Sequence, residues 1–504
     1  MIKYNAYLKY IFFIILLNIV VRLPSVFQEL PPYIFVDENI FLDKAFRHYQ
    51  IDRYYINRVN QIVYYLASAP SYLFSAIIGE KISKSEFTIF ARLFSPVLMN
   101  SISSALIFLI AIILFNSKRK SFLISMLYSI SPLIMGISRM VYPDHILILG
   151  SSTILLLCLL KLKKDINSFA ILSSITISIT SSIKIQGLSL IIPCLIVIVY
   201  PFFAKSKSMS KNNLIPIIKQ FILIFPLIII FFILLNPIIW FEGLEPFKKY
   251  IEFKNSLYEK EEWPFAQSNN NYLFYFMLMF VVSYGWVGFT FIIYGINYLF
   301  RKNSLFLILL LVCPFTIISI LGGYSIALVR NVSIGIPFIF FILIFGLDSF
   351  LKKLKNPYAR YLIIILIILE PGYKTSITIF NDLRTDSRIK AKKWIENNLP
   401  ENSTLSISGY LKDPFLEKSS PDFLVLDSWS SDMYKADYHK SEQKSKIIFT
   451  EPIFNNLHFI NPGAVFYKKK FSLFQKKMKN YMHIKTITGY GPDIFIYENV
   501  NRNK

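Results

Sequence analysis

The sequence predicts an α-helical polytopic membrane protein of about 11 transmembrane helices, followed by a small soluble α/β domain. The chain has 504 residues, of which 54% are hydrophobic, more than the usual share in soluble domains. The apolar residues are gathered in repeated runs of roughly 18–25 residues, and each run is long enough to cross a bilayer as a helix. After about residue 380 the pattern becomes charged and alternating, as in a soluble domain.

The net charge of +23 comes from basic residues clustered in short loops between the apolar runs. This is the distribution of cytoplasmic loops in membrane proteins, so we interpret it as the positive-inside pattern and expect no nucleic-acid partner. No phosphate-binding glycine loop, dinucleotide fingerprint or zinc-protease motif is present. The three cysteines lie inside apolar runs, which excludes a disulfide framework and a cysteine metal site.

The membrane domain is predicted over residues 1–380 and the soluble domain over 381–504. The predicted spans are 8–28, 90–116, 121–138, 145–161, 168–183, 187–203, 214–240, 271–299, 304–321, 332–350 and 359–378. With the basic loops inside, this count gives a cytoplasmic N-terminus and an external C-terminal domain. The composition is typical of an AT-rich prokaryote, so we expect a bacterial plasma (inner) membrane. The count depends on the last run, which Glu370-Pro371-Gly372 interrupts.

Two sizeable external loops are expected, at 29–88 and 241–270. The first has two amphipathic stretches, Asn39–Tyr49 and Val59–Ile78, which predict helices lying along the membrane interface. In the soluble domain, Arg388–Asn398 and 472–481 predict helices. Strands are predicted at Leu405–Ser408, Phe423–Leu426, Ile447–Phe449, Ile484–Thr488 and Ile494–Tyr497.

Charged residues gather at the predicted external ends of the spans. The first external loop carries the adjacent carboxylates Asp37 and Glu38, in a place where burial of charge is costly. The others at this membrane face are Arg139, Asp144, His145, Lys184 and Arg330. Carboxylates at this depth can accept protons, and cations can hold a phosphate at the bilayer boundary.

Each of these residues also has a structural interpretation. Asp37 can cap the helix that follows it, and Asp144 can favour the dipole of the span that it begins. The three cations Arg139, Lys184 and Arg330 can be side chains that extend from span ends to water. His145 and Glu38 are weak candidates for metal ligands: His145, like His48, has no second ligand at helical spacing and fits better as an interfacial polar residue.

Three motifs resemble those of a known family. They are Asp37-Glu38, with Ala91-Arg92-Leu93 opening the second span; the segment Pro132–Leu147, which contains Ser138-Arg139 and Pro143-Asp144; and Ser182–Gly187, which contains Lys184. In their order, they resemble motifs of the polytopic glycosyltransferases of the C superfamily (GT-C), over about residues 8 to 350. That group contains protein O-mannosyltransferases and the bacterial aminoarabinose transferase that acts on lipid A. Arg330-Asn331 departs from the family pattern, which has tyrosine after the arginine.

The resemblance implies an inverting glycosyltransferase with a polyprenyl-phosphate-linked sugar as donor. It implies that Asp37 is the general base, that Glu38 supports it, and that Asp144 orients the acceptor or the base. Lys184, Arg139 and Arg330, in that order, are the expected phosphate-binding cations. The acceptor is expected on a glycan, a glycolipid or a protein of the cell envelope. Metal use varies within the superfamily, and the motifs leave a divalent metal undecided.

Three other functions fit parts of the pattern. A flippase or exporter of lipid-linked saccharides would explain the spans and the cations, but not the Asp-Glu pair. An O-antigen polymerase or ligase would be an enzyme with a large late external loop. A non-catalytic scaffold would make the acidic pair incidental.

Overall fold

The computed structural model describes residues 5–28, 36–50, 61–204, 211–246, 248–249, 251–252, 270–324, 329–383, 387–400, 403–407, 422–427, 481–487 and 494–500. These residues form two compact units, which divide between Ile379 and Phe380. The predicted strand Ile447–Phe449, the predicted helix 472–481 apart from Tyr481, and most of the second external loop lie outside the described residues.

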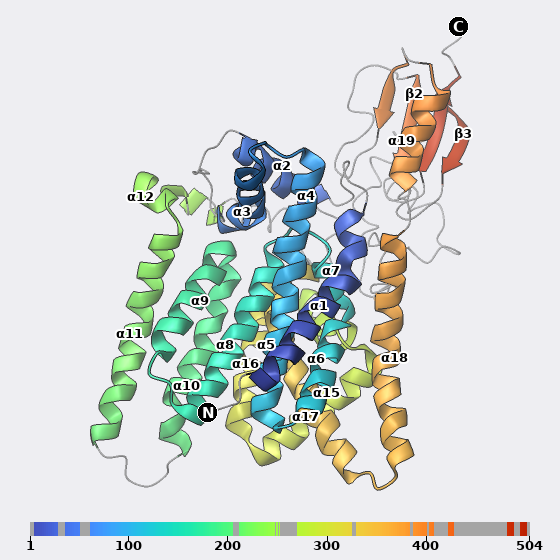
Figure 1. The fold of residues 1–504 in the computed structure, drawn as a ribbon. Helices are drawn as coiled ribbons and strands as arrows, with labels where there is room; N and C mark the ends of the chain where they lie inside the picture. The colour runs from blue at the N-terminus through green and yellow to red at the C-terminus, as the bar shows by residue number, and fades with distance from the viewer. Residues whose placement is uncertain are drawn as a thin grey trace. The chain divides into compact units, whose positions relative to one another are not determined.

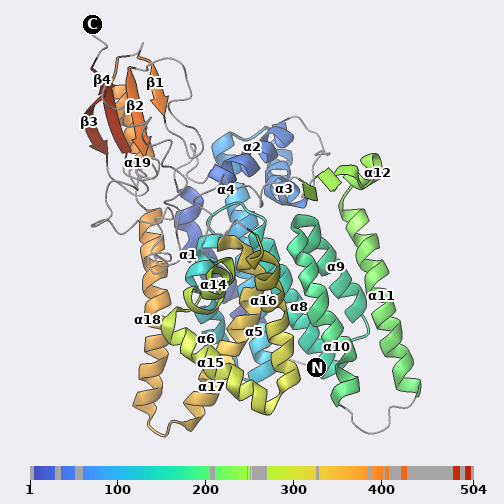
Figure 2. The same cartoon turned by 180° about the vertical axis from the view of Figure 1, so that it is seen from behind.

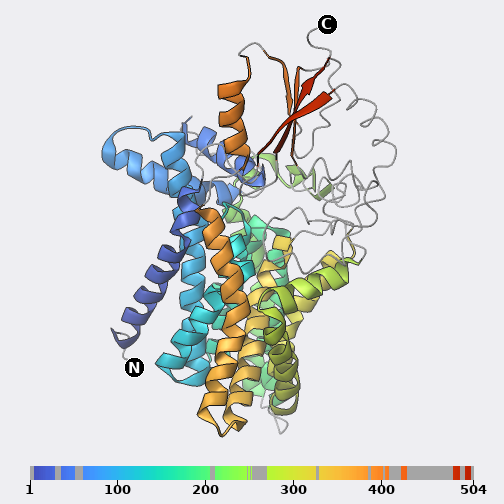
Figure 3. The same ribbon diagram turned by 90° about the vertical axis from the view of Figure 1, so that its right-hand side faces the viewer.

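The first unit is a bundle of helices whose long members stand side by side with roughly parallel axes (Figures 1, 2 and 3). Its α-helices are α1 (Asn5–Phe27), α2 (Val36–Gln50), α3 (Gln61–Ile78), α4 (Lys84–Arg92), α5 (Leu98–Phe115), α6 (Lys118–Ser129), α7 (Pro132–Ile137), α8 (Asp144–Lys164), α9 (Phe169–Ile183), α10 (Ile191–Ala204), α11 (Lys211–Leu235), α12 (Ile238–Glu242), α14 (Asn271–Met277), α15 (Gly285–Lys302), α16 (Ser304–Gly322), α17 (Ile336–Lys353) and α18 (Pro357–Asp382).

Within the part of the chain that the structure describes, four short irregular helical segments interrupt this bundle. Two are π-helices, η1 (Leu93–Val97) between α4 and α5 and η4 (Leu278–Val282) after α14. Two are 3-10 helices, η2 (Ile185–Leu190) after α9 and η5 (Val329–Gly335) before α17.

The protein is a multi-pass membrane protein. Among the described residues, seven helices are long and apolar enough to cross a membrane: Tyr7–Phe27, Lys84–Phe115, Asp144–Lys164, Ile218–Leu235, Ser304–Gly322, Arg330–Lys353 and Pro357–Asp382. The pair Asn271–Val282 and Gly285–Lys302 adds an eighth if it is counted as one span. Phe169–Ile183 and Ile185–Pro201 are shorter apolar helices.

Three predicted spans differ from the structure in detail. The predicted span 271–299 is not one straight helix, because α14 and α15 are bent by 98° at Ser283–Tyr284. The predicted span 121–138 is divided into α6 and α7 before Pro132, a residue that favours the start of a new helix. The last predicted span is not interrupted: α18 runs for 26 residues through Glu370-Pro371-Gly372.

The contacts of Glu370 explain why this carboxylate occurs within the apolar helix α18. Its Oε2 atom accepts a hydrogen bond from the backbone N–H of Trp286 at 2.9 Å, at the start of α15. Lys374, one turn further along α18, pairs with Oε1 at 2.7 Å. The carboxylate therefore satisfies a free N–H at a helix N-terminus, where negative charge is stabilising.

Helix α11 is attached to α9 by a row of hydroxyl hydrogen bonds. Ser174 and Ser178 of α9 donate to the carbonyl oxygens of Ile224 and Ile228, at 3.2 and 2.9 Å. Only 11% of the residues in the apolar stretch Ile218–Leu235 of α11 are buried within the protein. The rest of α11 presents an apolar surface suited to lipid, so polar groups at its one packed face provide the specific contacts.

The two ends of the bundle differ in charge. Helices α8 and α17 both end in lysines, at Lys164 and Lys353, and Lys120 at the start of α6 pairs with Asp348 near the end of α17. We call this the basic end. Helix α8 has 21 residues, which corresponds to about 31 Å, close to the hydrocarbon thickness of a bilayer. Its other terminus, at Asp144, defines the Asp144 end.

Helices α2, α3 and α4 cover the Asp144 end of the bundle (Figure 1). Helices α2 and α3 correspond to the two predicted amphipathic stretches. Helix α4 begins with a capping box, in which Ser83 and Glu86 satisfy each other's backbone N–H groups. Tyr49 and Phe87 are buried in the apolar cluster that joins these helices.

The second unit is a small α/β fold with α19 (Ser387–Asn398) and strands β1 (Leu405–Ile407), β2 (Phe423–Asp427), β3 (Tyr481–Ile487) and β4 (Ile494–Asn499). The strand order is β1-β2-β4-β3, with β1 parallel to β2 and the other pairs antiparallel. Helix α19 lies against one face of the sheet (Figure 3), where Ala391 packs with Val425 and Ile496. The predicted small α/β domain is thus confirmed.

Candidate functional site

The site is built around the loop between α7 and α8, residues 138–143, at the Asp144 end of the bundle. A Pro at position 143 precedes α8, which restricts the preceding residue to extended backbone and gives the loop a sharp entry into the helix. Two polar centres lie on either side of this loop. We call them the Glu38 centre and the Asp144 centre.

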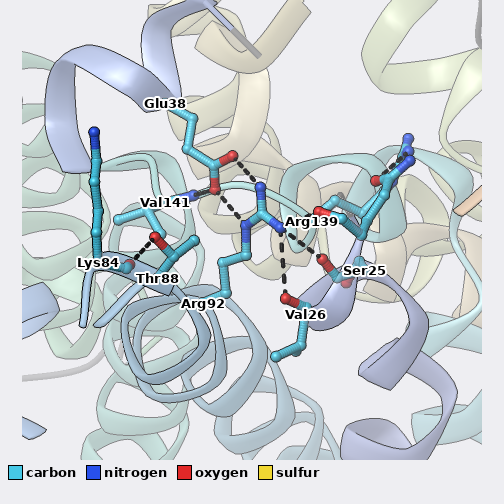
Figure 4. A network of polar contacts seen from close by, with 9 residues as sticks. Ser25, Val26, Glu38, Lys84, Thr88, Arg92, Arg139 and Val141 are labelled. Atoms are coloured by element: carbon cyan, nitrogen blue, oxygen red, sulfur yellow. Dashed lines mark hydrogen bonds and ion pairs between the residues drawn. The ribbon is translucent and has the colours of Figure 1, made fainter. Parts of the chain in front are cut away.

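The Glu38 centre is a buried bidentate ion pair between Glu38 and Arg92 (Figure 4). Arg92, the last residue of α4, donates from Nε to Glu38 Oε1 at 3.0 Å and from Nη2 to Oε2 at 2.7 Å. The Glu38 side chain has no exposed surface and that of Arg92 has 2%. The backbone N–H of Val141 donates to the same Oε1 atom at 3.0 Å. Both oxygens are thus engaged, and the carboxylate joins α2, α4 and the loop.

The end of α1 completes the Glu38 centre. Nη1 of Arg92 donates to the carbonyl oxygen of Gln28 at 2.7 Å and lies within 3.5 Å of those of Ser25 and Val26. The side chain of Gln28 accepts from Nη2 of Arg139 at 3.5 Å. Carbonyl groups at a helix C-terminus lack partners within the helix, and here a guanidinium group satisfies them.

The Asp144 centre joins three segments that are far apart in the sequence. Asp144 is fully buried, and its Oδ1 atom accepts from Lys184 Nζ at 3.0 Å. Arg330 Nε lies 3.9 Å from Oδ2. The Lys184 side chain is 15% exposed and that of Arg330 is 31% exposed. One buried carboxylate therefore holds two cations that both keep some open surface.

Asn331, which replaces the tyrosine of the family pattern, takes part in this centre. Its Oδ1 atom accepts from Lys184 Nζ at 2.7 Å, and its Nδ2 atom donates to the hydroxyl of Tyr275 at 3.3 Å. Ser333, in the same 3-10 helix η5, lies 3.5 Å from Asp144 Oδ1. The asparagine thus orients the ammonium group of Lys184.

The two centres are close together. Val141 belongs to the first and Asp144 to the second, and three peptide units span at most about 11 Å. Tyr142 lies between them, with the Arg330 guanidinium 4.6 Å from its ring centroid and the Phe41 ring in edge contact at 5.9 Å. Phe41 belongs to α2, so α2 is fixed to the loop both through Glu38 and through this aromatic contact.

Asp37, the predicted base, is the second residue of α2, and its side chain lies outside the described residues. The position itself can be located on the helix. Residues four apart lie on the same helix face, so position 37 shares a face with Phe41, which contacts Tyr142.

His145 is buried beside Asp144 and forms a hydrogen bond of 2.8 Å between Nε2 and Ser95 Oγ. Ser95 lies in the π-helix η1, a type of segment that is frequent at functional sites. Among the described residues there is no group of three or more His, Cys, Asp or Glu side chains that could hold a metal. Glu38 is engaged by Arg92.

The structure thus brings together most of the residues singled out in the sequence, but in two different environments. Lys184 and Arg330 meet at Asp144, whereas Arg139 is buried beside Gln28. Sequence reasoning did not anticipate Arg92 as the partner of Glu38, nor the polar face of α1. The available signal was the spacing of Asn18, Arg22 and Ser25 within an apolar run, which places three polar side chains on one helix face.

Comparison with known proteins agrees with this architecture. Residues 68–240 match the family model for dolichyl-phosphate-mannose-protein mannosyltransferase. The family model thus covers part of the chain, and it agrees with the resemblance to GT-C membrane glycosyltransferases that the sequence motifs indicate. No curated protein sequence matches the chain.

Two solved structures of one enzyme share the fold. ArnT from Cupriavidus metallidurans in the apo state matches with a TM-score of 0.53 at 11% sequence identity, over 97% of this chain and 98% of that one. ArnT from the same organism bound to undecaprenyl phosphate matches with a TM-score of 0.50 at 10% identity, over the same shares. At this identity the likeness is one of fold.

Proposed function

We propose that the protein is an inverting membrane glycosyltransferase that moves a sugar from a polyprenyl-phosphate donor to an acceptor hydroxyl at the external face of the membrane. The observation that carries this proposal is the Asp144 centre, where a buried carboxylate pairs with two partly exposed cations. Cations held in this way suit a phosphate at a bilayer boundary. The match to the mannosyltransferase model and the fold shared with ArnT support the same reaction class.

Lys184 and Arg330 are the proposed phosphate-binding residues. The donor is a phosphodiester with one negative charge, and the leaving polyprenyl phosphate gains charge as the bond to the sugar breaks. Cations already in place stabilise that charge without reorganisation. Asp144 accepts a hydrogen bond from Lys184 and lies 3.9 Å from Arg330. Arg139, the remaining predicted cation, is assigned a supporting role because it is buried against Gln28.

Asp37 is the proposed general base. It would take the proton of the acceptor hydroxyl while the acceptor oxygen bonds to the anomeric carbon and the bond from that carbon to the phosphate oxygen breaks. This single displacement inverts the anomeric configuration, and the phosphate leaves without needing an acid. Glu38 is assigned to holding α2 in place, since both its oxygens are occupied. The acceptor class comprises glycans, glycolipids and proteins.

The Asp37→Asn variant tests this assignment. Membranes that contain the full chain would be given a panel of radiolabelled polyprenyl-phosphate sugars, and transfer into the acceptor fraction would be measured. We expect the variant to lose transfer by about 100- to 10,000-fold, the usual contribution of a general base. Asp43→Asn is the matched control, because Asp43 lies on the same helix and pairs with Lys84 at the surface.

Wild-type transfer by Asp37→Asn would overturn the base assignment. Movement of the labelled donor across the membrane without any transfer would instead favour the flippase reading. If neither transfer nor movement occurs with any donor, the scaffold reading stands and the enzyme assignment fails.

A further inference from the structure

Arg22 is a buried cation that the proposed chemistry does not use. It lies in α1, within an apolar span, and is 1% exposed. Its Nε atom donates to Ser138 Oγ at 2.8 Å, Nη1 to Asn18 Oδ1 at 2.7 Å and Nη2 to the carbonyl oxygen of Ser129 at 3.1 Å. Among the described residues, none of its ion-pair or hydrogen-bond partners is a carboxylate. A charge at membrane depth is costly, so such residues usually have a function.

Arg22 belongs to a polar stripe on α1 that faces the site. The stripe consists of residues spaced four or three apart, all buried: Asn18, Arg22, Ser25 and Gln28. Such spacing places them on one helix face. The opposite face carries exposed apolar residues such as Phe12 and Val20. The first span therefore has a lipid face and a site face.

The stripe holds the loop that carries the site. Arg22 bonds to Ser138 at the beginning of the loop, and Gln28 accepts from Arg139 immediately after it. Glu38 then fixes the backbone at Val141, and Lys184 fixes Asp144 at the far end. These fixed points come from α1 and its C-terminal end, from α2 and from the end of α9. The contact between Arg22 and Ser138 is the first of them.

We propose that Arg22 is a positioning residue that acts through Ser138. Its hydrogen bond fixes the start of the loop and thereby sets the place of Asp144 and of the cations around it. This inference rests on the proposed function, because the loop then shapes the site for a lipid phosphate. It assigns the buried arginine of the first span to the site rather than to the stability of the bundle alone.

The test compares three variants of the purified full chain: Ser138→Ala, Arg22→Lys and the double variant. Ser104→Ala is the matched control, because the Ser104 hydroxyl donates to Asn18 Oδ1 in the same network but does not contact the loop. The first measurement is hydrogen–deuterium exchange of peptides covering residues 138–146. We expect faster exchange there in Ser138→Ala and Arg22→Lys, no further increase in the double variant, and no change in Ser104→Ala.

The second measurement is binding of undecaprenyl phosphate as the probe. We expect Ser138→Ala to weaken binding about tenfold, which corresponds to the loss of one charge-assisted hydrogen bond. Ser104→Ala should bind as the wild type does, with a similar melting temperature to Ser138→Ala. The double variant should bind no more weakly than Arg22→Lys alone.

Two results would overturn the inference. One is unchanged exchange at residues 138–146 in both Ser138→Ala and Arg22→Lys. The other is a loss of undecaprenyl phosphate affinity in the double variant that equals the product of the two single losses. That result would mean that Arg22 acts on the site by a route other than Ser138. If the wild type does not bind the probe while the exchange changes as expected, the proposed function fails and the positioning role remains. Ser138→Ala removes one hydroxyl, so the test does not depend on a variant that fails to fold.

Discussion

Arg92 donates two hydrogen bonds to the Glu38 carboxylate, from Nε at 3.0 Å and from Nη2 at 2.7 Å, and both side chains are buried. The fork of a guanidinium matches the two oxygens of a carboxylate, so this contact fixes orientation as well as distance. It joins α2, which carries the proposed base, to the end of α4. Glu38, the second carboxylate of the acidic pair, thus holds the helix in place.

The first prediction concerns this pair. Glu38→Gln should destabilise the protein by about 3–5 kcal/mol, because Arg92 then keeps a buried charge without a partner. Replacing both residues, as Glu38→Leu with Arg92→Met, should recover much of that loss. Stability would be measured by thermal or denaturant unfolding in detergent.

The matched control is Asp43→Asn, a change on the same helix as Glu38 that removes an ion pair with Lys84 of α4. Both side chains of that pair are 40% exposed, so its loss should cost at most about 1 kcal/mol. Equal losses for Glu38→Gln and Asp43→Asn would contradict the structural role of Glu38.

A second prediction separates the two cations of the Asp144 centre. Lys184→Met should reduce both stability and undecaprenyl phosphate affinity, because it leaves the buried Asp144 without its closest cation. Arg330→Gln should reduce affinity with little change in stability, since Arg330 is more exposed and 3.9 Å from the carboxylate. Binding and melting temperature would be measured on the same preparations.

Lys352→Met, at the basic end, is the control for the removal of a lysine. Its side chain is 72% exposed, and it should leave both quantities unchanged. A loss of affinity in Lys352→Met equal to that in Lys184→Met would show that the probe responds to overall charge rather than to the Asp144 centre.

The third prediction concerns the bend between α14 and α15. Gly285 has a φ of +76°, and a Cβ atom there would lie 2.2 Å from Glu370 Oε2. Gly285→Ala should therefore destabilise the protein by at least about 1–2 kcal/mol, the cost of a left-handed residue, with the displacement of Glu370 in addition. Unfolding in detergent measures the loss.

Gly372→Ala serves as its comparison, because the nearest atom to a Cβ at that position is Ile368 Cγ2 at 3.8 Å. This change lies within α18 and should be neutral or stabilising by up to about 1 kcal/mol. If both alanine variants had the same stability, the capping of α15 by Glu370 would not be a constraint on the fold.

The fourth prediction concerns orientation. Helix α18 begins just after the lysines that end α17 and is long enough to cross the membrane. If the basic end is cytoplasmic, as the positive-inside rule requires, the chain after α18 is external. An alkaline phosphatase fused after residue 400 should then be active. A fusion after Lys355, at the basic end, should be inactive, and the reverse pattern would place the site in the cytoplasm.

Much of the fold was predictable because it depends on local pattern. A long apolar run must form a helix in lipid, whichever residues it later contacts, so the membrane class follows from composition. The helices α2, α3 and α19 and the four described strands were predicted by periodicity. The bend at Gly285 was not, because the carboxylate that stabilises it comes from α18, far along the sequence.

By itself, the sequence determined the class of protein, the approximate helices, and the membrane face that gathers Asp144, Lys184 and Arg330. Only the tertiary structure decided which charges meet. Glu38 and Arg92 are 54 residues apart, and Lys184 and Asn331 are 147 apart. Such pairings depend on how helices pack rather than on spacing along the chain. The same packing places the polar face of the first span against the loop of the site, where Arg22 contacts Ser138. Buried polar groups need hydrogen-bond partners, and here the partners come from distant parts of the chain.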